Sequence, residues 1–127
     1  MLDTSIAIHA RDGTEAVLAR LAAHEGAVIL SALSLAELQR GVFKGGLDGP
    51  RRQARLGILL RHIPVLAFDE AAALAYGQII AHCGWVRGRD YDRMIGAHAL
   101  ATKSVLVTNN SVDFADIPGL RIEDWVV

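Results

Sequence analysis

Residues 27–37 read Ala27-Val28-Ile29-Leu30-Ser31-Ala32-Leu33-Ser34-Leu35-Ala36-Glu37, and this stretch decides the fold class. Its first four residues are apolar and partly β-branched, which predicts a buried strand over Ala27–Leu30. A helix over Leu35–Phe43 is predicted next, and Ser34-x-x-Glu37 has the pattern of a capping box at its start. A strand that leads directly into a helix is the repeating unit of α/β folds.

The same alternation continues in both directions along the chain. Short apolar runs predict strands at Met1–Leu2, Ala27–Leu30, Val65–Phe68, Val105–Thr108 and Leu120–Glu123. Helical patterns, several preceded by Ser or Asp at the N-cap position, predict helices at Ser5–Arg11, Thr14–His24, Leu35–Phe43, Arg51–Arg61, Glu70–His82 and Tyr91–Thr102. This order predicts a mostly parallel sheet sandwiched between helices.

Length and composition predict one soluble domain over residues 1–127. No repeat, low-complexity tract or linker divides the sequence, and its 52% apolar residues never form the run of about 18 that would span a bilayer. The sequence starts without a secretory pattern, and Cys83 is the only cysteine. We therefore expect a cytoplasmic protein with neither a disulfide framework nor a cysteine zinc site.

Basic and acidic residues nearly balance, at 13 and 14, so nucleic-acid binding would depend on a local patch. Between residues 44 and 61, five basic residues stand against the single acid Asp48, a local net charge of +4. A second basic group follows further along the chain. The two groups consist of Lys44, Arg51, Arg52, Arg55 and Arg61, and of Arg87, Arg89 and Arg93. Taken alone, both groups also fit solvated helix or loop faces.

Acidic and amide side chains follow several of the predicted strands. Asp3 comes directly after the first strand, and Glu37 lies one turn into the helix after the second. Asp92 opens the last predicted helix. Asn109, Asn110 and Asp113 follow the fourth strand. Sites of parallel α/β sheets lie outside the carboxyl ends of the strands, so we expect these side chains to gather there.

Each acid also has a purely structural explanation. Asp3 could N-cap the first helix, Glu37 could serve only its capping box, and Asp92 could be a first-turn acid favoured by the helix dipole. Asp69 and Glu70 start another helix with nothing site-like beside them. We expect these two to be capping acids, and they provide a comparison for the others.

Considered together, the acids indicate a metal site. Carboxylates brought close repel one another unless a cation lies between them, and hard oxygen ligands favour Mg²⁺ or Mn²⁺. Such ions promote phosphodiester hydrolysis. Without a cation, several gathered carboxylates cannot all stay ionised, so we expect at least one to have a raised pKa. The five histidines lack a metal-ligand spacing, and we expect them to be structural.

These motifs, in this order, resemble those of the PIN-domain ribonucleases, specifically the VapC-type toxins of bacterial toxin–antitoxin pairs. The resemblance runs almost end to end. It is carried by Leu2-Asp3-Thr4-Ser5 and by residues 30–41, 92–99, 106–114 and 117–125. Ser5 stands where the family more often has Asn, and Asn110 stands where some relatives have Asp.

The resemblance implies a PIN-like three-layer α/β/α sandwich with a mostly parallel central sheet, and a Mg²⁺- or Mn²⁺-dependent endoribonuclease. It implies a triad of metal-binding carboxylates, a fourth ligand that is either of two residues, and nearby hydroxyls that orient ligands or waters. These residues are Asp3, Glu37 and Asp92 for the triad, Asp113 or Asn110 for the fourth place, and Thr4, Ser5 and Thr108 for the hydroxyls. Asp90, two residues before Asp92, is expected to be a loop acid or an N-cap.

The resemblance also implies partners. A homodimer and a cognate VapB-type antitoxin are expected, together forming a hetero-oligomer that contacts promoter DNA only through the antitoxin. The antitoxin is expected to insert a segment into the active-site groove, where an Arg or Lys could satisfy the carboxylates in place of metal. The RNA backbone would be held by Arg51, Arg52, Arg55, Arg87 and Arg89. No membrane association is expected.

Three alternative functions remain open from the sequence. A phospho-acceptor receiver domain has a similar length, with Asp69 after the third strand and Thr108 ending the fourth. It lacks an acidic pair after the first strand, and Lys103 precedes the fourth strand where a lysine after a fifth is required. A structure-specific PIN-like DNA nuclease and a catalytically inactive binding module are the others. Which RNA is cut, and at which sequence or structure, leaves no readable code in the chain.

Overall fold

Short parallel strands form the centre of this mixed α/β protein. The computed structural model describes residues 1–126. The four named strands lie in two parallel pairs, β1 with β2 and β3 with β4. Their bounds are β1 (Leu30–Ser31), β2 (Val65–Leu66), β3 (Leu106–Val107) and β4 (Ile122–Glu123).

Leu2 joins the two strand pairs. It forms parallel bridges to Leu30 of β1 on one side and to Val107 of β3 on the other. Backbone hydrogen bonds from Leu2 N to the Ile29 oxygen (3.1 Å) and from Asp3 N to the Val107 oxygen (2.9 Å) fix this register. The resulting order across the sheet is β2, β1, Leu2, β3, β4.

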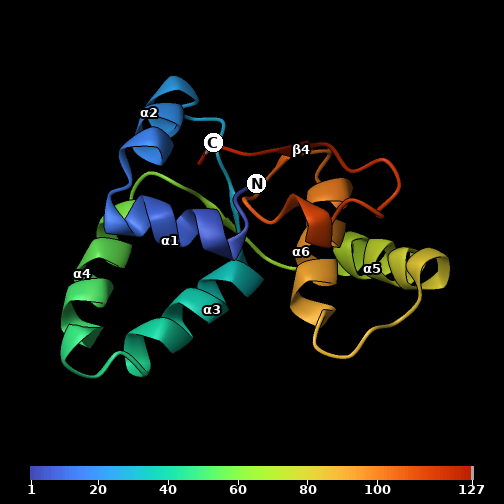
Figure 1. Cartoon of the computed structure of the whole chain (residues 1–127), viewed down its shortest axis with the longest axis horizontal. Helices are drawn as coiled ribbons and strands as arrows, with labels where there is room; N and C mark the ends of the chain where they lie inside the picture. Colours follow the sequence, from blue (N-terminus) through green and yellow to red (C-terminus); the bar gives the residue numbers. More distant parts are fainter. Residues whose placement is uncertain (127) are drawn as a thin grey trace.

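Helices cover the strands on both sides. Figure 1 shows α1 to α4 together on one side of the molecule, and α5 with α6 on the other. Two 3₁₀ turns, η1 (Gly46–Asp48) and η2 (Ser111–Asp113), lie in the connections. The helix bounds are α1 (Thr4–Asp12), α2 (Glu15–Ala23), α3 (Ala32–Phe43), α4 (Gly49–Leu60), α5 (Glu70–Cys83) and α6 (Asp90–Ala101). Within residues 1–126, no helix is both long and apolar enough to cross a membrane.

Two hydrophobic clusters match this division. The first is built around the fully buried Leu2 and the apolar faces of α1 to α4, and it includes Ile6, Val17, Leu30, Leu38 and Leu56. The second lies between α5, α6 and the C-terminal strand pair, and it includes Ile79, Ile95, Leu106, Phe114 and Ile117. Burial of such side chains is the main term that stabilises the fold.

The structure corrects the predicted start of α3. Ser31, not Ser34, is the N-cap, and its hydroxyl accepts a hydrogen bond from Leu33 N at 3.1 Å. Ser34 lies inside the helix and is fully buried. The predicted capping box is therefore wrong. The N-cap is Ser31, three residues before Ser34, at the buried end of β1. Glu37 is therefore not the third residue of the helix and has no capping role.

Other element bounds shift by a few residues. The strands are shorter than predicted, and the Met1–Leu2 strand is reduced to bridges at Leu2. Helix α4 begins at Gly49 instead of Arg51, because Pro50 fits the first turn of a helix. Asp69 caps α5 as predicted, accepting from Ala72 N at 3.0 Å.

A buried histidine ties the two halves together. His98 of α6 is 1% exposed, and its Nδ1 lies 2.8 Å from Ser31 Oγ at the end of β1. Burial lowers the pKa of His98, while the charge of Asp69 and a backbone hydrogen bond to Ala67 offset part of this effect. The imidazole is thus held in its neutral form, bridging α6, β1 and the segment after β2.

We expect His98 to make the protein acid-sensitive. Its folded pKa lies below the ordinary 6.5, so as pH falls below 6.5 the unfolded chain takes up a proton that the folded chain does not. The free energy of unfolding should therefore fall from pH 6.5 down to the lowered pKa. Urea denaturation of His98→Asn should show a flatter pH dependence there. The exposed His82→Asn is the matched control and should keep the wild-type slope.

Candidate active site

Asp3 stands at the carboxyl end of the central strand segment. Its side chain is 5% exposed, which is low for a carboxylate, and it caps α1 by accepting a hydrogen bond from Ile6 N at 3.0 Å. Ser5 Oγ approaches the same oxygen, Oδ1, at 2.7 Å. Both contacts use Oδ1, so the capping explanation is correct but leaves Oδ2 available to a ligand.

Glu37 projects from the second turn of α3 and is oriented from α1. The Thr4 hydroxyl donates to its Oε1 at 2.6 Å. Arg40 Nη2 lies 3.7 Å from Oε2, too far for a hydrogen bond, and the arginine is largely exposed. Glu37 thus shares the geometry of Asp3, with one oxygen held by a neutral hydroxyl and the other only weakly engaged.

Asp92 lies in the first turn of α6, close enough to the other acids for their charges to affect its pKa. Its pKa is raised, first by burial and then by the charges of Asp113, Glu37 and Asp3, with Arg89 partly offsetting them. The expectation that a gathered carboxylate has a raised pKa is therefore confirmed. Carboxylates from four separate segments thus lie within electrostatic range of Asp92 or belong to it, and we call this set the acidic site: Asp3, Glu37, Asp92 and Asp113.

The two candidates for the fourth metal ligand, Asp113 and Asn110, lie in different surroundings. Asp113, in η2, contributes to the raised pKa of Asp92, and Arg89 donates to its backbone oxygen at 2.8 Å. Asn110 is exposed, and its backbone N donates to Thr108 Oγ1 at 2.9 Å. The buried Thr108 hydroxyl therefore shapes the turn that leads to η2.

Asn109 was expected from the sequence to gather with the other side chains after the fourth strand but was given no role, and in the structure it contacts Ser5. Its Oδ1 lies 2.7 Å from Ser5 Oγ, which is also within hydrogen-bond distance of Asp3. A hydroxyl has one proton, so Ser5 can donate to only one of them at a time. The signal that could have identified Asn109 is its place directly after Thr108 at the end of β3.

Asp90 is separate from the acidic site. It is the first residue of α6, and Arg89, not Asp90, occupies the N-cap position. Its Oδ1 accepts hydrogen bonds from the Tyr76 hydroxyl at 2.6 Å and from Trp85 Nε1 at 3.0 Å. Asp90 is thus an orienting residue for two aromatic side chains, which the expected capping role did not foresee.

Some arginines of the two basic groups are already bound to other parts of the protein. Arg93 was grouped with Arg87 and Arg89 as a phosphate-binding candidate, and this prediction is wrong because its side chain is 3% exposed and both terminal nitrogens bind Asp116, at 2.6 and 2.7 Å. On α4, Arg52 donates to the Gly41 oxygen at 2.9 Å, while Arg51 remains exposed.

The donor set of the acidic site fits a hard divalent cation. Asp3 and Glu37 each keep an oxygen free, and the shared repulsion at Asp92 is what a cation would relieve. No three Asp, Glu, His or Cys side chains within residues 1–126 converge closely enough to hold an ion as they stand. The charge effects on Asp92 and the lack of a close ligand cluster are compatible. Charges affect one another over distances far longer than the Mg²⁺–oxygen distance of about 2.1 Å.

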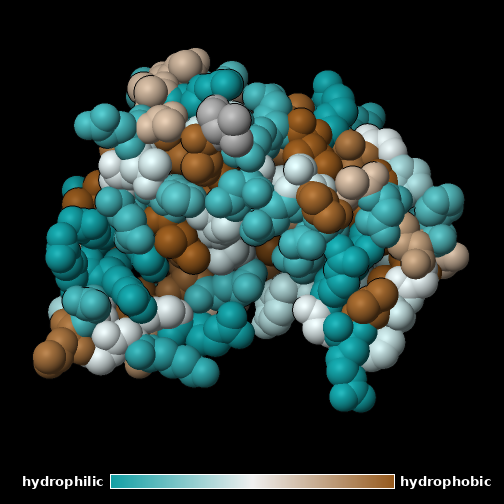
Figure 2. Space-filling view, in the orientation of Figure 1, coloured by the Kyte–Doolittle hydropathy of each residue, from teal (hydrophilic) through white to brown (hydrophobic). Residues whose placement is uncertain are grey.

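The helices that carry two of the acids, α3 and α6, lie on opposite sides of a depression. Figure 2 shows an indentation in the lower edge of the molecule, between the side that holds α3 and the side that holds α6. Glu37 belongs to α3 and Asp92 to α6. An extended polymer crossing this edge could therefore meet carboxylates from both halves.

Comparison with known proteins identifies the class. Residues 1–120 match the PIN domain family. The chain is 36% identical over 129 residues to the "tRNA(fMet)-specific endonuclease VapC" of Shigella flexneri, covering 98% of this chain and 96% of that protein. Among solved structures, VapBC2 from Rickettsia felis bound to a DNA fragment from their promoter aligns with a TM-score of 0.88 at 30% identity, covering 98% of this chain and 97% of the other. DNA-bound VapBC from Salmonella typhimurium aligns with a TM-score of 0.88 at 35% identity, and the alignment covers 98% of this chain and 96% of the other.

The chain therefore belongs to the PIN domain family, within its VapC branch of toxin nucleases. The resemblance stated from the sequence motifs is confirmed, and the receiver-domain alternative is excluded. This assignment is consistent with acids gathered at the carboxyl ends of parallel strands.

Removing one charge from the acidic site should relieve repulsion. In Asp92→Asn, with EDTA present, the melting temperature should hold or rise. Because the folded pKa of Asp92 is raised, its contribution to stability is fully present below its ordinary pKa of 3.8 and is lost as pH climbs through the raised value. This loss should be absent from Asp92→Asn in urea titrations between pH 4 and 8.

Asp69→Asn is the control for this experiment. Asn caps a helix about as well as Asp, so Asp69→Asn should keep the loss of stability through the raised pKa of Asp92, and only the His98 contribution should shift, because the Asp69 charge raises the pKa of His98. An Asp92→Asn protein that melts far below wild type without metal would make Asp92 a structural first-turn acid and remove it from the acidic site.

Proposed function

We propose that this protein is a Mg²⁺- or Mn²⁺-dependent endoribonuclease and the toxin component of a VapBC-type toxin–antitoxin module. It acts as a single PIN domain over residues 1–127, folded as a three-layer α/β/α sandwich. The metal ligands are Asp3, Glu37, Asp92 and Asp113, with Asn110 as the alternative to Asp113. Thr4, Ser5 and Thr108 orient these ligands or the waters between them.

One observation carries the proposal: Asp92 is partly buried within electrostatic range of acids from three other segments, and its pKa is raised first by burial and then by the charges of Asp113, Glu37 and Asp3. Such an arrangement is unfavourable in isolation, because three or four carboxylates repel one another in a partly buried space. Folded proteins retain such repulsion mainly at functional sites. The names of the related nucleases supply the reaction class, and the carboxylates supply ligands of the required hardness.

The protein's own groups hold the carboxylates ready. Neutral donors, the Thr4 hydroxyl and the Ile6 amide, fix one oxygen of Glu37 and of Asp3. Because these donors carry no full charge, they orient the acids without satisfying them electrostatically. A divalent cation, when bound, supplies polarisation of the scissile phosphate and activation of water.

Loss of one carboxylate charge should abolish cleavage without unfolding the chain. We expect Asp3→Asn, Glu37→Gln and Asp92→Asn each to cut activity by more than about 100-fold, since even outer-shell substitutions cost about 10- to 100-fold. Thr4→Val should fall within that smaller range. The assay is digestion of tRNA, rRNA, single-stranded DNA and duplex DNA, with Mg²⁺ or EDTA.

The matched control is Asp69→Asn, which alters an acid that only caps α5 and should keep wild-type cleavage. Wild-type cleavage by Asp92→Asn would remove that residue from the metal site. Cleavage of DNA but not RNA would replace the proposal by the DNA-nuclease alternative. Metal-independent cleavage would contradict it altogether.

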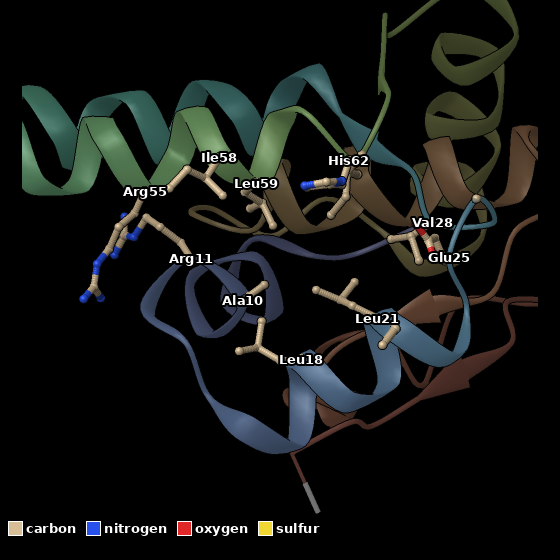
Figure 3. Close-up of a pocket in the computed structure, with 13 residues that line it drawn as sticks. Ala10, Arg11, Leu18, Leu21, Glu25, Val28, Arg55, Ile58, Leu59 and His62 are labelled. Atoms are coloured by element: carbon tan, nitrogen blue, oxygen red, sulfur yellow. The ribbon is translucent and has the colours of Figure 1, made fainter.

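We further infer that the cognate antitoxin binds across α1, α2 and α4. A groove of about 380 Å³ lies between these helices. In Figure 3, Leu18 and Leu21 of α2 face Ile58 and Leu59 of α4 across this groove. Leu18 is 43% exposed and Ile58 55% exposed, so the groove is an unpartnered apolar surface suited to an amphipathic helix. The aligned structures of VapBC support a partner of this kind.

Helix α1 links the groove to the acidic site. Asp3 caps the start of α1, and Arg11 near its end lines the groove. At 1.5 Å per residue the two positions are about 12 Å apart along the helix. One antitoxin chain could therefore seat a helix in the groove and extend a basic side chain to the carboxylates. A homodimer of such complexes would contact promoter DNA through the antitoxin alone.

Ile58→Glu should weaken the complex with the VapB-type antitoxin by at least about 10-fold, because it places a charge in a contact that buries apolar surface. Nuclease activity without antitoxin should stay at the wild-type level. Binding can be measured by calorimetry with the purified partner. Leu74→Glu, on the comparably exposed Leu74 of α5, is the control and should bind normally. Equal affinity of Ile58→Glu and wild type would place the antitoxin elsewhere.

A further inference from the structure

Two aromatic side chains stand exposed where the chain enters α6, the helix that carries Asp92. Trp85, in the loop between α5 and α6, is 58% exposed, and Tyr91 at the start of α6 is 43% exposed. Trp125, in contrast, is 4% exposed and stacks on His24. Trp85 thus leaves most of its indole surface in water, and core packing does not explain its position.

The loop that carries Trp85 is fixed by specific contacts. Trp85 Nε1 donates to Asp90 Oδ1 at 3.0 Å, and the Tyr76 hydroxyl donates to the same oxygen at 2.6 Å. A turn closed by Arg89 N and the Val86 oxygen, at 3.2 Å, contains Gly88 with a left-handed φ of 83°. The indole is therefore held by its edge while its face stays open.

The same loop is anchored to the acidic site. Arg89 Nη2 donates to the Asp113 backbone oxygen at 2.8 Å, and the Arg89 charge partly lowers the pKa of Asp92. Asp90, which orients Trp85, lies two residues before Asp92 on α6. Arg87 and Arg89 place positive charge on both sides of Gly88, within a few residues of the ring.

We propose that the Trp85 face is a stacking platform for an unpaired base of single-stranded RNA lying next to the phosphate that is cut. This inference rests on the proposed ribonuclease function and adds a side chain, Trp85, that binds a base of the substrate. Single-stranded RNA is recognised mainly by stacking of splayed bases on aromatic rings and by contacts of arginine with phosphates. A ring ordered before binding, on a loop that carries two arginines and is joined to Asp113 through Arg89, meets both requirements. Tyr91 lies close enough in sequence to offer a second ring.

The test uses RNA binding without cleavage. In EDTA, a mixed-sequence 12-nucleotide RNA is titrated against the whole protein while tryptophan emission is followed. The chain has two tryptophans, and Trp125 is buried, so quenching reports on Trp85. The same RNA with abasic positions is titrated in parallel, because it keeps the phosphates and lacks the bases.

Intact RNA should quench the emission, and abasic RNA should not. Trp85→Ala should weaken binding of intact RNA by about 5- to 100-fold, the usual effect of removing one stacked aromatic ring. Trp85→Phe keeps a ring and should lose less affinity. With Mg²⁺ present, Trp85→Ala should raise KM and leave kcat unchanged, since the stack forms in both ground and transition states. Val86→Ala, its exposed non-aromatic neighbour, is the control and should match wild type.

Wild-type affinity of Trp85→Ala for intact RNA, in a protein that still cleaves RNA, would overturn the platform and leave the ribonuclease function standing. A Trp85→Ala protein that changes from dimer to monomer in sedimentation, with unchanged RNA affinity, would assign this surface to contacts between copies and overturn it as well. Absence of any RNA cleavage by wild type would remove both the platform and the function on which it rests.

Discussion

The pairing of Leu2 with two strands at once is the constraint on which the rest of the structure depends. Leu2 is fully buried and bridges β1 and β3, so the following residue, Asp3, must emerge at the middle of the sheet edge. Glu37 follows β1 and Asp113 follows β3, which places both beside Asp3. Once the register is set, the acids have no freedom to separate, and their repulsion becomes a property of the fold. The apolar burial of α1 to α4 and of α5 with α6 opposes that repulsion.

Much of this arrangement could be predicted from the sequence, because it follows from the periodicity of apolar residues and from the positions of acids relative to the predicted strands. Apolar runs of β-branched residues located the strands within a few residues, and three of the acids predicted near their ends, Asp3, Glu37 and Asp113, lie within electrostatic range of Asp92. The helix start at Ser31 was missed since two serines three residues apart both fit a cap, and only burial of the strand end selects between them. The contact of Asn109 with Ser5 was not foreseen because it joins residues 104 positions apart. Contacts of that range leave no local pattern.

Side-chain direction was the harder quantity to predict. Arg93 and Arg89 lie four residues apart in a basic segment, yet Arg93 is buried against Asp116 while Arg89 reaches Asp113. His98 was expected to be structural and is, but its hydrogen bond to Ser31 could be known only from the packing of α6 on β1. Likewise, Asp90 and Asp92 are both early residues of α6, and helix geometry turns one toward Tyr76 and the other toward the acids.

The distribution of positive charge explains why the acidic site stays available to a cation. A carboxylate paired closely with arginine is stabilised in its ionised form and has little further use for metal. Asp116 shows this case, because the guanidinium of Arg93 lowers its pKa to about 2. Arg93 follows Asp92 directly, but successive residues of a helix point about 100° apart, and its guanidinium reaches Asp116. The arginines nearest the site carboxylates, Arg40 and Arg89, stay 3.7 Å away from Glu37 and Asp113. The fold thus separates Asp116, which is paired closely with arginine, from Glu37 and Asp113, whose arginine contacts are longer.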